Sequence, residues 1–128
     1  MDFGLKGKTA LVLGASQGLG AACAKELALE GANVIAAARN TDAIDAWAKE
    51  ARLGDKVRAV RLDLADADAV SAFAGKMSAE GIDIVVNNCG GPAAGPAKGQ
   101  SRAAWLAAFE AMALPIMQIT DALLQGMT

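Results

Sequence analysis

The chain has 128 residues, a length that suits one domain covering residues 1–128. Its formal net charge is −2 and only 4% of its residues are aromatic, so we expect neither a nucleic-acid partner nor an anionic membrane partner. Histidine and tyrosine are both absent, which removes the most common general base and metal ligand, and we expect no metal site.

The sequence carries no sign of secretion. Residues 1–6 lack the basic and apolar regions of a signal peptide, and the longest apolar stretches, such as residues 82–86, are too short to span a bilayer. The two cysteines, Cys23 and Cys89, are far apart and form no C-x-x-C pair. These features favour a reduced, cytoplasmic location. We expect Cys23 on the core face of a helix, and Cys89 to pack rather than react, because no base lies beside it.

Short apolar runs alternate with helical patterns along the chain. The runs predict four buried strands, at residues 9–13, 33–38, 57–62 and 82–86. Helices are predicted at residues 18–30, 41 to about 53 and 66 to about 79. Thr41 is the expected N-cap of the second helix, and the three helices are expected to end at Gly31, Gly54 and Gly81.

A glycine-, proline- and alanine-rich loop then leads to Gln100, and Ser101 opens a last long helix that ends at Gly126. One face of this helix carries an apolar stripe at helical spacing, made of Trp105, Phe109, Met112, Ile116, Ile119 and Leu123. Pro115 lies inside the helix and should bend it, because proline removes a backbone donor.

The strict alternation of strands and helices predicts an α/β fold with a parallel sheet. Right-handed crossovers give the strand order 3-2-1-4, the first part of a Rossmann-type sheet with helices on both faces. We expect the later strands of such a sheet to lie outside these 128 residues. The fourth strand is as apolar as a central strand, so we expect a further strand to pair with it. A ligand is expected at the carboxyl ends of the first and fourth strands.

The strongest signal is the stretch Gly14-Ala15-Ser16-Gln17-Gly18-Leu19-Gly20, between the first strand and the first helix. Glycines let backbone N–H groups approach a phosphate closely, and the helix dipole favours negative charge at the same point. We expect a dinucleotide's phosphates to be held by Gly14, Ser16, Gln17, Gly18, Leu19 and Gly20. The alternative is a glycine-rich turn that only packs the helix tightly on the strand.

Other candidates follow the second, third and fourth strands. Arg39, with Asn40 beside it, comes 19 positions after Gly20 (39 − 20), where an arginine accommodates the 2′-phosphate of NADP; alternatively, Arg39 is a solvated surface residue. Asp63 could accept from an adenine amino group beside the Leu64 N–H, or could serve as an N-terminal helix charge. Asn88, Cys89 and Gly90 end the fourth strand, where close backbone approach to a ribose or nicotinamide is possible.

Together these residues resemble the short-chain dehydrogenase/reductase family over nearly the whole chain. Gly14, Gly18 and Gly20 fall on its T-G-x3-G-x-G motif, Asp63 on its adenine-binding aspartate, and Asn87-Asn88-Cys89-Gly90 on its N-N-A-G. The stretch from Asn87 to Pro92 is similar to the branch of 3-oxoacyl acyl-carrier-protein reductases. Two positions depart from the pattern: Leu13 replaces the motif's threonine, and Met112 stands where the family often has an active-site asparagine.

The resemblance implies binding of NADP(H), or less favourably NAD(H), and hydride transfer between NADPH and a small carbonyl substrate such as a 3-oxoacyl group or another ketone. The family's catalytic serine and Tyr-x3-Lys would follow Thr128, so we expect no catalytic residue here and no activity from a fragment of this length. The last helix would form a homo-oligomer interface or pack against a missing C-terminal half. The alternative is a non-enzymatic half-Rossmann module for nucleotide binding or dimerisation.

Overall fold

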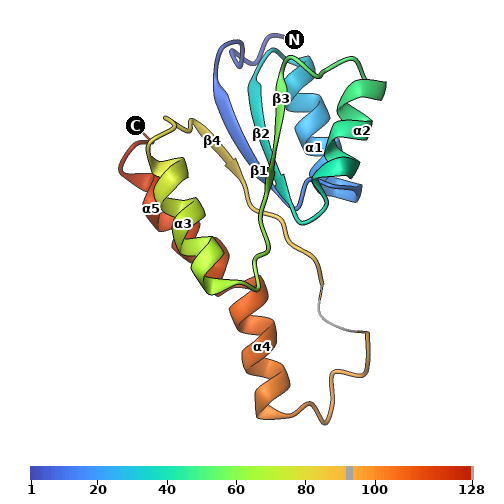
Figure 1. Ribbon diagram of the computed structural model, residues 1–128, viewed down its shortest axis with the longest axis vertical. Coiled ribbons are helices and arrows are strands. Elements are labelled where there is room, and N and C mark those ends of the chain that lie inside the picture. The colour runs from blue at the N-terminus through green and yellow to red at the C-terminus, as the bar shows by residue number, and fades with distance from the viewer. Residues whose placement is uncertain (92–93, 128) are drawn as a thin grey trace.

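The computed structural model describes residues 1–91 and 94–127 and contains one four-stranded parallel sheet (Figure 1). Pro92, part of the predicted glycine-rich stretch, lies outside the described residues. The strands, in the spatial order β3-β2-β1-β4, are β1 (Thr9–Leu13), β2 (Asn33–Ala38), β3 (Val57–Arg61) and β4 (Ile84–Val86). The fold class and the strand order predicted from the sequence are confirmed.

Strand β4 is shorter than predicted because it begins at Ile84, and Asp83 before it is hydrogen-bonded to β1 through its side chain. The Asp83 carboxylate accepts the Thr9 backbone N–H at 2.9 Å, and the Asp83 N–H donates to the Thr9 carbonyl at 2.8 Å. Regular pairing begins one residue later, at Ala10 opposite Ile84. The β4 residues are half-buried and pair with β1, so this edge of the sheet carries apolar side chains.

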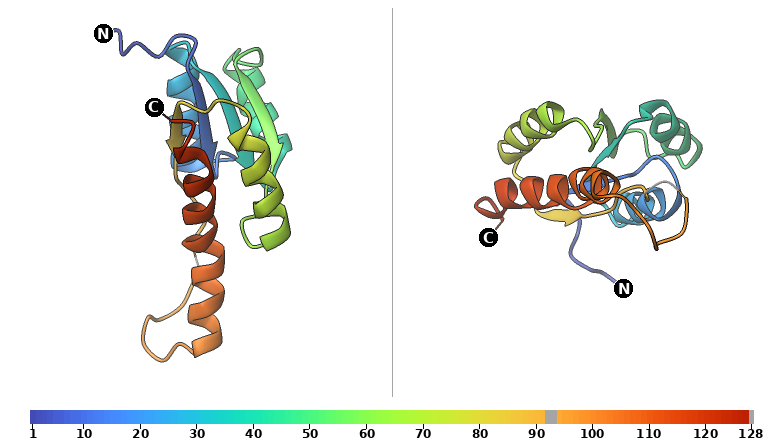
Figure 2. Two further views of the ribbon diagram at one scale, coloured as in Figure 1. Left: turned by 90° about the vertical axis from the view of Figure 1, so that its left-hand side faces the viewer. Right: turned by 90° about the horizontal axis from the view of Figure 1, so that it is seen from below.

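Helices cover both faces of the sheet, α1 (Gly18–Leu29) and α2 (Thr41–Glu50) one face, α3 (Ala67–Ser78) and α5 (Leu114–Leu124) the other (Figures 1 and 2). Alternate strand residues serve the two faces. In β1, Ala10 and Val12 pack toward α1 and α2, whereas Leu11 and Leu13 pack toward α3 and α5. The inner face of α1 is glycine and alanine, which allows this helix to pack close to the sheet, whereas α2 packs with Ile44, Trp47 and Ala48.

Two predicted details of α2 were wrong. Asn40, not Thr41, is the N-cap, because its side-chain oxygen accepts the Ala43 N–H at 3.1 Å. The helix ends at Glu50, and Arg52 adopts the left-handed conformation (φ 59°) that was expected of a glycine, so Gly54 is not its stop.

Cys23 was predicted to face the core and is exposed. The buried face of α1 is formed by Gly20, Ala21, Ala24 and Ala28, and Cys23 lies outside this stripe. In an alanine-rich helix most positions are equally apolar, so the sequence gives little indication of which face of the helix packs on the sheet.

The predicted last helix consists of two segments, α4 (Arg102–Met112) and α5, interrupted at Ala113. Pro115 stands in the first turn of α5, where a missing N–H costs little. Figure 2 shows α4 and α5 running end to end, with α4 projecting beyond the sheet. None of the α4 residues is buried, and Trp105 and Phe109 are 61% and 50% exposed. Ile119 and Leu123, which continue the predicted apolar stripe along α5, are buried, so the stripe is uncovered over α4 only.

The segment Arg102–Leu124 also corrects the expectation that no stretch reaches membrane-spanning length. This segment has 23 residues, and an 18-residue window within it, of which 11% is buried, has a mean hydropathy of 1.3. By length and composition alone, the segment could cross a bilayer. The sequence argument considered only unbroken apolar runs and overlooked alanine-rich segments whose average is equally apolar.

Candidate functional site

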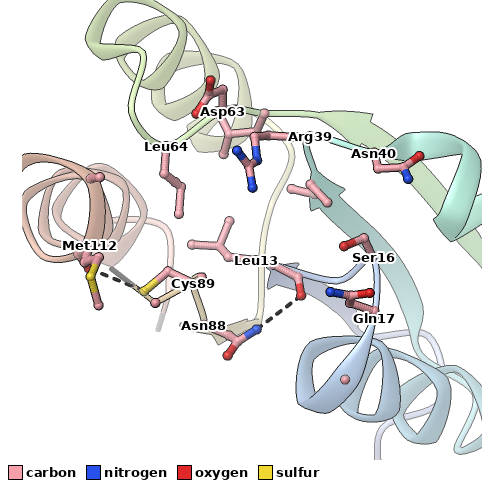
Figure 3. A pocket seen from close by; sticks show the side chains of 18 of the residues that line it. Leu13, Ser16, Gln17, Arg39, Asn40, Asp63, Leu64, Asn88, Cys89 and Met112 are labelled. Atoms are coloured by element: carbon pink, nitrogen blue, oxygen red, sulfur yellow. Dashed lines mark hydrogen bonds between the residues drawn. The ribbon is translucent and has the colours of Figure 1, made fainter. Parts of the chain in front are cut away.

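A cavity of about 630 Å³ opens at the carboxyl ends of the strands (Figure 3). Apart from Gly20, which lies behind the loop, the residues predicted to bind a cofactor all line it: Gly14, Ser16, Gln17, Gly18, Leu19, Arg39, Asn40, Asp63, Leu64, Asn88, Cys89 and Gly90. They come from four separate segments of the chain. The parallel sheet brings them together because all its strands end at the same edge.

The three motif glycines are required for three different reasons. Gly14 has φ +62°, and a Cβ there would come within 2.7 Å of the Asn88 Nδ2 atom. A Cβ on Gly20 would overlap the Gly14 carbonyl oxygen, so this glycine lets α1 pack against the loop. Gly18 has φ +61° and open space around it, so only its backbone conformation demands glycine.

The amino end of α1 is left open toward the cavity. Its N-cap, Gln17, is extended (φ −159°, ψ 176°) and makes no capping hydrogen bond with its side chain, and the first turn contains no acidic residue. Helix N-termini carry partial positive charge and unpaired N–H groups. This end of α1 can therefore accept an anion such as a phosphate.

Arg39 and Asp63 lie on the side of the cavity opposite Asn88 (Figure 3). Arg39 directly follows β2 and is exposed; in residues 1–91 and 94–127 the ion pair present is Arg58–Glu80, so Arg39 forms none there. Asp63 follows β3 and accepts the Ala65 N–H at 3.0 Å. The N-cap of α3 is Asp66, which accepts the Ala69 N–H at 3.1 Å, so capping does not explain the carboxylate at position 63.

The fourth segment follows β4 and contacts both the glycine loop and the last helices. Asn88 donates from Nδ2 to the Gly14 carbonyl at 3.1 Å. Its neighbour Cys89 is half-buried, and its thiol lies 3.8 Å from the Met112 carbonyl, as a weak hydrogen bond (Figure 3). Asn87 points elsewhere and donates to Thr120 Oγ1 at 3.3 Å.

The residues predicted to bind the cofactor did not include the apolar part of the lining, which is formed by Leu13, Ala37, Ala38, Ala43, Leu62, Ala65, Gly91, Ala111 and Met112. Ala37, Ala38 and Leu62 end their strands beside polar candidates, a position that could have identified them. Met112, at the position where the family often has an active-site asparagine, does line the cavity, and Ala111 accompanies it where α4 ends. Among the described residues, no cluster of His, Cys, Asp or Glu side chains is arranged to hold a metal ion.

Residues 8–128 match the family model described as short chain dehydrogenase. The chain belongs to the short-chain dehydrogenase family. It is 44% identical over 89 residues to retinol dehydrogenase 13 of Mus musculus, and the aligned residues cover 66% of this chain and 27% of that protein. It is also 42% identical over 109 residues to D-threitol dehydrogenase of Mycolicibacterium smegmatis, covering 81% of this chain and 41% of the relative.

The fold of this family member is also found among solved structures. L-sorbose reductase from Gluconobacter frateurii, complexed with NADPH and L-sorbose, superposes with a TM-score of 0.85 at 30% identity. The superposition covers 99% of this chain and 50% of the reductase. The chain thus spans half the length of that structure, and a smaller share of the two curated relatives named above.

Proposed function

We propose that the cavity binds NADP(H). The observation that carries this proposal is the uncapped amino end of α1 facing the same cavity as Arg39, which forms no ion pair within the described residues. One anion position at a helix N-terminus and one cation at the end of β2 suit a dinucleotide with a pyrophosphate and a 2′-phosphate. The NADPH held by the structurally similar L-sorbose reductase supports the same cofactor.

Each segment of the lining has a role in this proposal. The N–H groups of residues 16–18 in the glycine loop bind the pyrophosphate, and Arg39 with Asn40 binds the 2′-phosphate. Asp63 accepts from the adenine amino group, because a carboxylate that holds the Ala65 N–H keeps further lone pairs free. The backbone of residues 88–90 lies against the nicotinamide ribose, where Gly90 is exposed and leaves room.

For the whole protein we propose hydride transfer between NADPH and a carbonyl carbon of a small substrate, a 3-oxoacyl group or another ketone. The bound cofactor supplies the hydride, and this chain's residues bind it and orient its reactive ring. The similarity of residues 87–92 to the 3-oxoacyl reductase branch is the reason for naming that substrate class. A cytoplasmic location and assembly into homo-oligomers through α4 and α5 remain part of this proposal.

A non-enzymatic nucleotide-binding module is the second candidate function. One observation favours it: these 128 residues contain neither tyrosine nor histidine, two common proton donors to a developing alkoxide. Both candidates require NADP(H) binding and differ only in whether a carbonyl is reduced.

Calorimetric titration of the protein with NADPH tests the binding proposal. We expect a single saturable site. We also expect 2′,5′-ADP to compete for it, because this compound carries the 2′-phosphate and the adenosine-side phosphate of the pyrophosphate. Loss of NADPH absorbance with a panel of 3-oxoacyl thioesters and simple ketones would show carbonyl reduction and contradict a purely nucleotide-binding module. Saturable NADPH binding without turnover is expected of both candidates for a chain of this length, and no NADPH binding contradicts both.

A further inference from the structure

Two successive carbonyl groups of the glycine loop each accept a hydrogen bond from a side chain of another segment of the chain. Asn88, after β4, donates to the Gly14 carbonyl, and Trp47, in α2, donates from its indole Nε1 to the Ala15 carbonyl at 3.0 Å. The second bond is buried and joins positions 32 residues apart. Trp47 is 7% exposed and Ala15 is fully buried.

Both backbone polar groups of Ala15, its N–H and its carbonyl, are hydrogen-bonded inside the protein. Its N–H donates to the Ala37 carbonyl of β2 at 3.1 Å, while its carbonyl accepts from Trp47. A carbonyl that is occupied by an indole inside the protein cannot turn its negative end toward a bound phosphate. The N–H groups of the following residues, 16–18, are then the ones presented to the cavity.

Packing alone does not hold this part of the loop. A second hollow, of about 500 Å³, lies between α1 and α2 and is lined by Ser16, Gln17 and Gly18 as well as by Trp47 and Lys25. Residues 16–18 therefore have open space on two sides, the cofactor cavity and this hollow. Their position depends on the residues that anchor them, Ala15 before and the first turn of α1 after.

The Trp47 ring also connects the two helices that flank the loop. The Lys25 ammonium, from α1, lies 5.5 Å from the centroid of the indole in α2. Trp47 follows Ala43, which lines the cofactor cavity, by one helical turn. One side chain thus links the start of α2, beside Arg39, to the loop at the start of α1.

We propose that Trp47 is a positioning residue for the phosphate loop and sets the affinity for the pyrophosphate of the dinucleotide. This inference rests on the proposed NADP(H) function. Its effect is transmitted through the Ala15 carbonyl and requires the indole N–H, not just a ring at this position. A phenylalanine keeps the ring and the contact with Lys25 but leaves the buried Ala15 carbonyl without its donor.

The test compares wild-type protein with Trp47→Phe and, as a matched control, Trp105→Phe, which changes the exposed tryptophan of α4. NADPH and 2′-AMP are titrated into each, since 2′-AMP has the 2′-phosphate but no pyrophosphate. We expect Trp47→Phe to weaken NADPH binding by about three- to tenfold, to leave 2′-AMP binding unchanged, and the control to change neither. Equal NADPH affinity in wild type and Trp47→Phe, or an equal loss for both ligands, would overturn the inference. Failure of the wild type to bind NADPH would instead contradict the proposed function.

A second measurement applies even if Trp47→Phe folds poorly. In the Trp105→Phe variant, Trp47 is the one remaining tryptophan, so its indole N–H gives a single resonance. We expect this proton to exchange slowly with solvent and its resonance to shift on addition of NADPH but not of 2′-AMP. An indole proton that exchanges as fast as that of Trp105 in wild type, or that does not respond to NADPH, would overturn the inference.

Discussion

The Asn88 side chain donates a hydrogen bond of 3.1 Å to the carbonyl of Gly14, a residue 74 positions earlier in the chain. This bond joins the end of β4 to the turn that follows β1. Gly14 lacks a Cβ at the point where the Asn88 amide approaches, so the glycine and the asparagine depend on each other. The shape of the phosphate loop is therefore set in part by a segment from the far side of the cavity.

Replacing Asn88 with alanine should weaken NADPH binding by about tenfold, because the Gly14 carbonyl loses its donor and the loop gains freedom. The matched control is Asn87→Ala, because the Asn87 side chain is hydrogen-bonded to Thr120 and not to the loop. NADPH titration of the two variants checks this. Equal losses in both variants would show that the Asn88 bond has no specific role in the loop.

Replacing Gly20 with alanine should abolish measurable NADPH binding and lower the free energy of unfolding by about 1–3 kcal/mol, because the new Cβ meets backbone. Gly75→Ala is the control. Gly75 lies within α3 with open space around it, so the same change there should raise the free energy of unfolding by up to about 1 kcal/mol. Urea unfolding of both variants measures the contrast, and a Gly20→Ala variant as stable as wild type would refute the close-packing argument.

Helix α5 should be held on the sheet by one face only. Ile119 is fully buried against α3 and the sheet, and Ile119→Ala should lower the free energy of unfolding by about 2–4 kcal/mol. Leu124, in the same helix, is 57% exposed, and its replacement by alanine should change the same quantity by less than about 0.5 kcal/mol. Similar effects at both positions, in thermal or urea unfolding, would mean that the outer face of α5 is also buried in solution.

Much of the fold could be predicted from sequence because its signals are local. Apolar runs placed the strands, and the alternation of strands and helices predicted the order β3-β2-β1-β4. The segments that follow strand ends in a parallel sheet meet at one edge, so Arg39, Asp63 and Asn88 were predicted to share a site and do line one cavity.

The remaining features depend on contacts between distant residues. The Asp83 carboxylate replaces a strand hydrogen bond at Thr9, and no local pattern indicates this. The Trp47 indole looks like an ordinary core residue of α2, and only the fold brings it to Ala15. Cys23 was misplaced because an alanine-rich helix offers weak periodicity, and Pro115 indicated a disturbed helix but not that Ala113 would divide it in two.

The cofactor preference at Arg39 is the most direct test of the whole account. Arg39 should contribute one charge-assisted contact to the 2′-phosphate, so Arg39→Ala should weaken NADPH binding by about ten- to a hundredfold while leaving NADH binding unchanged. Arg61→Ala is the matched control, since Arg61 is an exposed arginine at the end of the neighbouring strand β3, outside the cavity lining. Parallel titrations of wild type and both variants with NADPH and NADH provide the comparison. A wild type that prefers NADPH, with the preference lost only in Arg39→Ala, is the predicted result; equal affinities for NADPH and NADH that neither variant alters would contradict it.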